Sequence, residues 1–68
     1  MTLGTELKKA REAAGLSQET VAFDAEVDRS YLSDIERDQH SPTVETLLRI
    51  CKAIGVNASE VFRGMEAG

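Results

Sequence analysis

Residues 17–42 constrain the fold of this chain more than any other stretch. They hold two short segments with helical apolar spacing, and each segment opens with a residue that caps helices well, Ser17 or Asp28. Only Ala25-Glu26-Val27 separates the two segments. Two helices joined by so short a turn form one unit, whose second helix can be presented to a partner. We therefore expect the rest of the chain to hold this pair at a fixed angle.

The other apolar residues also recur at spacings of three and four, which predicts helices throughout and no strand. Glycines follow the first and fourth predicted helices, where a left-handed residue ends a helix without strain. The predicted helices span residues 3–14, 18–25, 29–37, 44–54 and 58–63, and residues 64–68 are expected to form a flexible tail. The predicted core consists of Leu3, Leu7, Ala10, Ala14, Val21, Ala22, Ala25, Val27, Leu32, Ile35, Val44, Leu47, Leu48, Cys51, Ile54, Val61 and Phe62.

Length and composition exclude several classes of protein. Sixty-eight residues predict one domain with a small core, covering residues 1–68. A single cysteine rules out an internal disulfide, and one cysteine with one histidine cannot complete a zinc site. No apolar run is long enough to span a membrane or to form a signal peptide, so a cytoplasmic protein is expected. Because there is no nucleophile–base pair and no glycine-rich phosphate loop, we predict neither an enzyme nor a cofactor.

Three segments, KKAREAAGLSQETVA, DRSYLSDIER and SPTVETLLRICKAIGV, follow one another in the chain. With them, residues 3–62 resemble the XRE-type helix-turn-helix family of Cro and the phage repressors. The second segment is also similar to the recognition helix of restriction–modification controller proteins, which are small dimeric regulators. The resemblance implies a compact, all-α domain of five helices. It also implies a transcription regulator that binds a palindromic DNA operator as a homodimer, with the third helix in the major groove.

The resemblance further implies which residues meet DNA. The first residues of the third helix would read base edges, whereas the second helix, the third helix and the following loop would contact phosphates. The implied base-reading residues are Arg29, Ser30, Ser33 and Asp34, and the implied phosphate contacts are Gln18, Tyr31, Arg37, Gln39, His40 and Ser41. A structural ion pair between Arg11 and Glu36 is implied as well.

The chemistry of these side chains leaves alternatives open. The Arg29 guanidinium matches the N7 and O6 acceptors of guanine, but it could instead pair with Asp28. Asp34 could accept from a cytosine amino group or pair with Arg37, three residues on. Tyr31 could contact the DNA backbone or pack on a neighbouring helix. For the remaining polar residues the alternative is solvation without any contact to DNA.

The charge of residues 17–42 is unusual for a DNA-binding module. These residues include two bases and seven acids, which gives a net charge of −5 against −4 for the whole chain. The bases are Arg29 and Arg37, and the acids are Glu19, Asp24, Glu26, Asp28, Asp34, Glu36 and Asp38. We expect some of these acids to point away from DNA or to be engaged within the protein. Few phosphates would then be neutralised, and the salt dependence of binding would be shallow.

Glu26 stands in the turn at a position that is usually glycine in the family. If the turn needs a positive φ there, glutamate adopts it at a cost of order 1 kcal/mol.

Two surfaces could bind proteins. Apolar residues near the C-terminus exceed what one small core needs, which predicts a dimer face from the fourth and fifth helices made of Val56, Val61, Phe62 and Met65. Phe23 falls outside the buried face of the second helix and, if exposed, could belong to a partner interface. Because residues 17–42 carry a net charge of −5, an alternative function is a protein-interaction module, antitoxin-like or anti-regulator, that keeps the fold and binds a protein through its acidic face.

Overall fold

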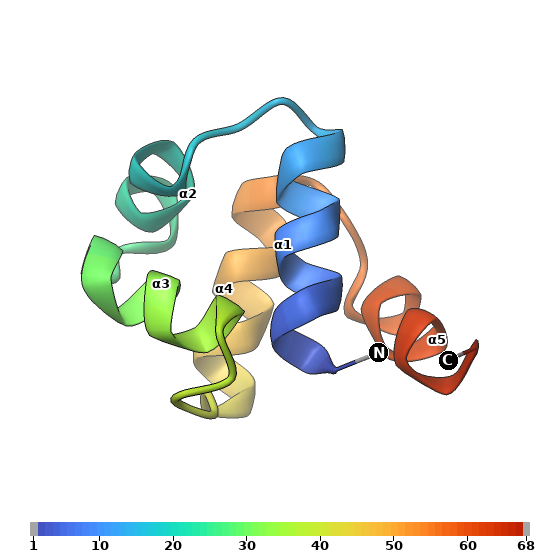
Figure 1. Cartoon of the computed structure of the whole chain (residues 1–68). Helices are drawn as coiled ribbons and strands as arrows, with labels where there is room; N and C mark the ends of the chain where they lie inside the picture. The colour runs from blue at the N-terminus through green and yellow to red at the C-terminus, as the bar shows by residue number, and fades with distance from the viewer. Residues whose placement is uncertain (1, 68) are drawn as a thin grey trace.

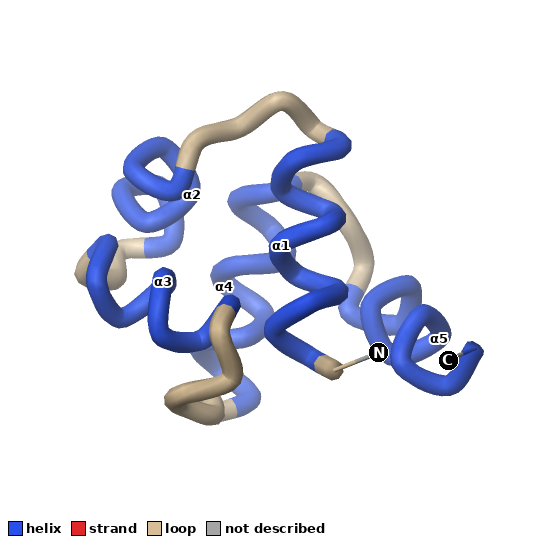
Figure 2. The backbone as a smooth tube through the Cα atoms, in the orientation of Figure 1, coloured by secondary structure: helices blue, strands red, loops and turns tan. Residues whose placement is uncertain are grey.

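The computed structural model describes residues 2–67, and within them it contains five helices and no strand. The helices are α1 (Leu3–Ala13), α2 (Gln18–Ala25), α3 (Arg29–Glu36), α4 (Val44–Ile54) and α5 (Ala58–Ala67). Figure 1 shows α2 and α3 on one side of α1 and α4, with α5 on the other side. Short loops join the helices (Figure 2). The predicted all-α, five-helix fold is confirmed.

Side-chain caps fix where four of the helices begin. The hydroxyl or carboxylate of each N-cap accepts a hydrogen bond from a backbone N–H in the first turn, at 3.1–3.2 Å. The capping residues are Thr2, Ser17, Asp28 and Thr43. At the C-terminal end, α5 continues to Ala67 instead of ending near Arg63. Residues 64–67 are thus helical rather than the tail expected, and Gly68 lies outside the described residues.

The turn between α2 and α3 does need a positive φ at Glu26, the position that is usually glycine in the family. Glu26 has φ 60° and ψ 43°, in the left-handed region. The Val27 N–H donates to the Ala22 carbonyl at 2.9 Å, which closes the end of α2. Val27 packs against the core as predicted, so the turn is fixed on both sides.

The core joins all five helices and differs from the prediction mainly in α4. The buried apolar residues are Leu7, Val21, Ala22, Ala25, Leu32, Ile35, Leu47, Ile50, Cys51, Ile54 and Val61. Val44 is 72% exposed and Leu48 is 53% exposed, whereas Ile50, which was not predicted, is fully buried. The stripe that packs on α2 and α1 is therefore rotated toward Leu47 and Ile50. Phe62 and Ala14 are also exposed rather than buried.

The start of α1 is fastened to the end of α3. A Cβ added at Gly4 would lie 2.3 Å from the Ile35 carbonyl oxygen, so only glycine permits this approach. The Gly4 N–H donates to Oδ1 of Asp38 at 3.0 Å, and the Thr2 hydroxyl donates to Oδ2 at 2.6 Å. Asp38 thereby holds the loop after α3 against α1.

Candidate nucleic-acid interface

The outer face of α3 carries the four predicted base-reading residues. Arg29 and Ser30 are exposed in its first turn, and Ser33 and Asp34 are half-buried one turn later. The opposite face of α3 is buried through Leu32, Ile35 and Glu36. These four side chains therefore share one face of a helix that the core holds rigidly from behind.

Arg29 is free to bind an external group. The Asp28 carboxylate accepts from the Ser30 N–H at 3.2 Å and so serves as the cap of α3. Within residues 2–67, no carboxylate oxygen lies within salt-bridge distance of the Arg29 guanidinium. The predicted alternative, an Asp28–Arg29 pair, is thus not present. An exposed guanidinium with five unengaged donors suits bidentate recognition of a base edge or a phosphate.

Asp34 is engaged within the protein. Its carboxylate accepts a hydrogen bond from the Arg37 guanidinium, and Nε2 of His40 lies 3.6 Å from its second oxygen. The rings of Tyr31 and His40 pack at a centroid distance of 5.7 Å. This geometry favours ion pairing over base reading for Asp34, and packing over backbone contact for Tyr31. It also partly neutralises Arg37.

A buried polar network lies behind the interface. Arg11 donates to both carboxylate oxygens of Glu36, from Nε at 2.7 Å and from Nη2 at 3.1 Å, and to the Leu16 carbonyl at 2.9 Å. This is the ion pair that the resemblance implied. The hydrogen bond to Glu36 raises the pKa of Arg11, and burial opposes that shift. The network fixes α1, α3 and the loop before α2 relative to one another.

Gln18 belongs to this network as well as to the surface. Its side-chain Nε2 donates to Glu36 at 2.9 Å, so part of its hydrogen-bonding capacity is used inside the protein. Gln18 is the first residue of α2, where backbone N–H groups favour an anion. The geometry therefore leaves the phosphate contact open to the amide oxygen or the backbone and directs the amide nitrogen inward.

The loop after α3 presents the remaining predicted phosphate contacts. Gln39, His40 and Ser41 are exposed, and the Gln39 N–H donates to the Asp34 carbonyl at 2.8 Å. This bond continues the last turn of α3 into the loop. The structure thus brings α3 and its loop together, and Gln18 at the start of α2 reaches the end of α3 through its hydrogen bond to Glu36.

Internal partners account for much of the acidic charge. Four of the seven acids accept hydrogen bonds from the protein itself: Asp28, Asp34, Glu36 and Asp38. Of the other three, Asp24 and Glu26 line a groove with Arg49 and Lys52 of α4. The net charge of −5 therefore overstates the negative charge that faces a ligand of α3.

The predicted dimer face needs one correction. Val61 is buried in the core, on the helix α5 that packs against α1. Val56 and Met65 are half-buried and Phe62 is exposed, so these three remain available. Phe23, on α2, is 84% exposed.

Sequence reasoning missed residues that position the interface. Arg49 of α4 donates from Nε to the Ala25 carbonyl at 3.0 Å and so holds the end of α2. Asp38 accepts a hydrogen bond from the Gly4 N–H in the first turn of α1, 34 positions away in the sequence. No local pattern marks either contact, although Gly4 inside a predicted helix was a usable signal of close backbone approach.

Within residues 2–67, no group of three or more His, Cys, Asp or Glu side chains is arranged to hold a metal ion. Among the described helices, none has the length and apolarity needed to cross a membrane.

Comparison with known proteins adds to this geometry. Residues 7–61 match the family described as "Helix-turn-helix". The immunity repressor protein of Bacillus phage phi105 is 39% identical over 61 residues, which are 90% of this chain and 42% of the repressor. The control protein C.MunI of Mycoplasma sp is 38% identical over 64 residues, covering 93% of this chain and 86% of that protein. The chain thus spans less than half of the phage repressor but most of the control protein.

A solved structure has the same fold. The restriction-modification controller protein C.AhdI from Aeromonas hydrophila superposes with a TM-score of 0.83 at 37% identity. The superposition covers 87% of this chain and 89% of that chain, so the likeness includes nearly the whole five-helix arrangement.

Proposed function

Because the chain belongs to the XRE-type helix-turn-helix family of DNA-binding transcription regulators, we propose that it binds a palindromic operator as a homodimer, with α3 in the major groove. Phage repressor and controller relatives support the regulator class. The observation that carries the proposal is the unpaired, exposed Arg29 at the start of α3. In this proposal the chain forms one helix-turn-helix domain that is not catalytic and acts in the cytoplasm.

In the proposed complex, the base-reading role falls chiefly on Arg29, with Ser30 and Ser33 beside it. A bidentate contact to guanine contributes about 1–3 kcal/mol of discrimination. Asp34 contributes indirectly by holding Arg37 and His40 at the end of the helix. Arg37, Gln39, His40 and Ser41 would then contact phosphates and set the register of α3.

The proposed dimer places two copies of α3 about 34 Å apart, one turn of the duplex, so that each protomer reads one half-site. Exposed apolar side chains on and before α5, at Val56, Phe62 and Met65, support a self-complementary contact. Val61 is excluded from this face because it lies in the core. Sedimentation that shows a monomer at micromolar concentration without DNA would count against the dimer.

The test is selection from a randomised duplex pool at low salt. We expect a palindromic winner whose binding is reduced about tenfold or more in Arg29→Ala. Lys52→Ala is the matched control, because it removes the same charge from an exposed position on α4. No enrichment at low salt, or equal loss in both variants, would contradict the proposal.

A second candidate function is the protein-interaction module. The observation that favours it is Phe23, which is 84% exposed and is followed in sequence by Asp24 and Glu26. Failure of the DNA selection, together with capture of a basic partner that Phe23→Ser abolishes, would replace the DNA-binding proposal with this one.

A further inference from the structure

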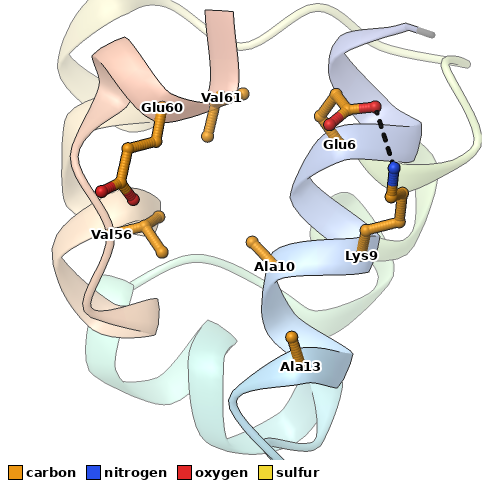
Figure 3. A pocket seen from close by; sticks show the side chains of 7 residues that line it. All are labelled: Glu6, Lys9, Ala10, Ala13, Val56, Glu60 and Val61. Atoms are coloured by element: carbon orange, nitrogen blue, oxygen red, sulfur yellow. Dashed lines mark ion pairs between the residues drawn. The ribbon is translucent and has the colours of Figure 1, made fainter. Parts of the chain in front are cut away.

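A groove on the molecule lies apart from the proposed DNA-binding face, between α1 and α5 (Figure 3). Its volume is about 270 Å³, just below the range of about 300–1,000 Å³ that drug-sized ligands occupy, which suits a smaller ligand. The floor and walls are small apolar side chains, and carboxylates stand at its edges. The lining residues are Glu6, Lys9, Ala10 and Ala13 of α1, Val56 of the preceding loop, and Glu60 and Val61 of α5.

Glu6 is the unusual member of this lining. Its side chain is only 10% exposed, and its Oε2 is buried without a hydrogen-bond donor among the described residues. The other oxygen lies under α5, where a Cβ added at Gly64 would come within 2.1 Å of it. A buried carboxylate oxygen without a donor is costly, so this position favours a group that brings donors and positive charge.

Lys9 supplies that charge only in part. Its Nζ lies 3.6 Å from Oε2 of Glu6, beyond hydrogen-bond distance, and its side chain is 60% exposed (Figure 3). Because the Lys9 side chain is long and mostly hydrated, it can turn into solvent at little cost. The groove beside it then gives access to the carboxylate.

We propose that this groove binds a small organic ammonium ion with a short apolar body. The ammonium donates to Oε2 of Glu6 and replaces the long contact with Lys9. The apolar body covers Ala10, Ala13 and Val56, and the Glu60 carboxylate on the facing side adds charge complementarity. An anion would be repelled by both carboxylates, and a neutral alcohol of the same shape would offer Glu6 only an uncharged hydrogen-bond donor.

The experiment is a titration of the isotope-labelled full chain with n-hexylammonium, followed by amide chemical shifts. We expect the amides of Ala10, Ala13, Val56 and Val61 to shift, with a Kd of about 1 mM or tighter. The neutral isostere n-hexanol should bind at least about tenfold more weakly, because it cannot form the charge-assisted hydrogen bond.

Two variants and one control complete the test. Glu6→Gln should weaken n-hexylammonium binding about tenfold or more, whereas Glu12→Gln, which removes the same charge from an exposed part of α1, should not. Ala13→Leu fills the groove and should abolish binding while keeping Glu6, which provides a second test if Glu6→Gln does not fold.

Several results would overturn the inference. These are no shift at saturating ammonium, equal binding of the alcohol, and binding that Ala13→Leu leaves intact. Shifts of the same amides with protein concentration alone would assign the groove to a second copy of the chain and also overturn it. None of these results bears on DNA binding through α3, so failure of the ammonium site is distinguishable from failure of that proposal. The last result would support the proposed dimer, whose face shares Val56 with the groove.

Discussion

At the scale of single residues, two residues have the same left-handed backbone conformation, but their side chains differ in the hydrogen bonds they form. Glu26 and Asp38 both have φ 60°. The Glu26 side chain is exposed and forms no hydrogen bond within the described residues, whereas the Asp38 carboxylate accepts hydrogen bonds from the Thr2 hydroxyl and the Gly4 N–H at the start of α1. The strain at Glu26 is thus uncompensated by side-chain contacts, and the strain at Asp38 accompanies two hydrogen bonds.

Glu26→Gly should therefore raise the free energy of unfolding by about 1 kcal/mol, because glycine adopts the left-handed region without strain. Urea denaturation measures the change. Asp38→Gly is the control at the same φ. It should give no such gain, since it removes the acceptor of the Gly4 N–H and the Thr2 hydroxyl. An equal gain from both variants would contradict the structural role of Asp38.

The ion pair of Arg11 and Glu36 is a second residue-scale test. The Glu36 side chain is 2% exposed, so Arg11→Met leaves a buried carboxylate without its main partner. We expect a loss of about 3–5 kcal/mol, enough to unfold much of a chain this small. Circular dichroism during urea denaturation would show it.

The double variant Arg11→Met/Glu36→Met separates the ion pair from simple packing. Removing both charges leaves no buried ion, so the double variant should be more stable than Arg11→Met alone. If the two losses simply add, the pair is not the source of the effect.

The buried thiol of Cys51 should make the stability of the fold fall at high pH. Burial raises the pKa of its thiol. The unfolded chain therefore releases this proton at lower pH than the folded chain. The buried, protonated Cys51 thiol contributes fully to the free energy of unfolding below the ordinary thiol pKa of about 8.5. This contribution is lost as pH rises through the raised pKa of the folded state. The difference in stability between wild type and Cys51→Ala, measured by denaturation, should shrink above about pH 9. A difference that stays constant to pH 10 would contradict it.

At the scale of helices, the sequence predicted most starts and ends because caps and glycines are local signals. Ser17, Asp28 and Thr43 mark where three helices begin, and Gly55 marks where α4 ends. The prediction was wrong for Val44 and Leu48 because periodicity identifies an apolar stripe but not which part of it neighbouring helices cover. The end of α5 was misplaced because Gly64 resembles a stop signal.

The two helical glycines predict different costs for an added methyl group. At Gly4 the new Cβ would meet backbone oxygens of Ile35 and Glu36, so α1 must move away from α3. At Gly64 it would meet only the end of the Glu6 side chain, which can move. Gly4→Ala should lower the free energy of unfolding by about 1–3 kcal/mol, through strain of an overpacked contact.

Gly64→Ala is the comparison, because alanine gains up to about 1 kcal/mol of helix propensity and offsets the displacement of Glu6. Thermal unfolding of both variants measures the contrast. If Gly64→Ala is the more damaging change, the close approach of α1 and α3 is not the tighter of the two contacts.

At the scale of the whole molecule, the sequence predicted the face that α3 presents but not the contacts that orient it. Residues 29, 30, 33 and 34 share a face by helical geometry alone. By contrast, the contact of Arg49 with the Ala25 carbonyl and that of Asp38 with α1 join residues far apart in sequence. Such contacts depend on the packing of α2 on α4 and of α1 on α3, which no local pattern specifies.

The charge distribution of the whole molecule determines how salt should affect DNA binding. Arg29 and Arg37 are the cations of the proposed interface, and Arg37 is partly neutralised by Asp34. A dimer would then neutralise no more than about four phosphates, so the slope of log K against log salt should be no steeper than about −4. Fluorescence anisotropy across a salt series on the selected operator measures this slope.

Arg37→Ala should make the slope shallower by about one unit for each protomer, and Lys52→Ala should leave it unchanged. A wild-type slope of about −6 or steeper would require phosphate contacts from other cations, such as Lys8 or Lys9 of α1. The DNA would then extend from α3 onto α1, toward the side of the molecule on which the α1–α5 groove opens.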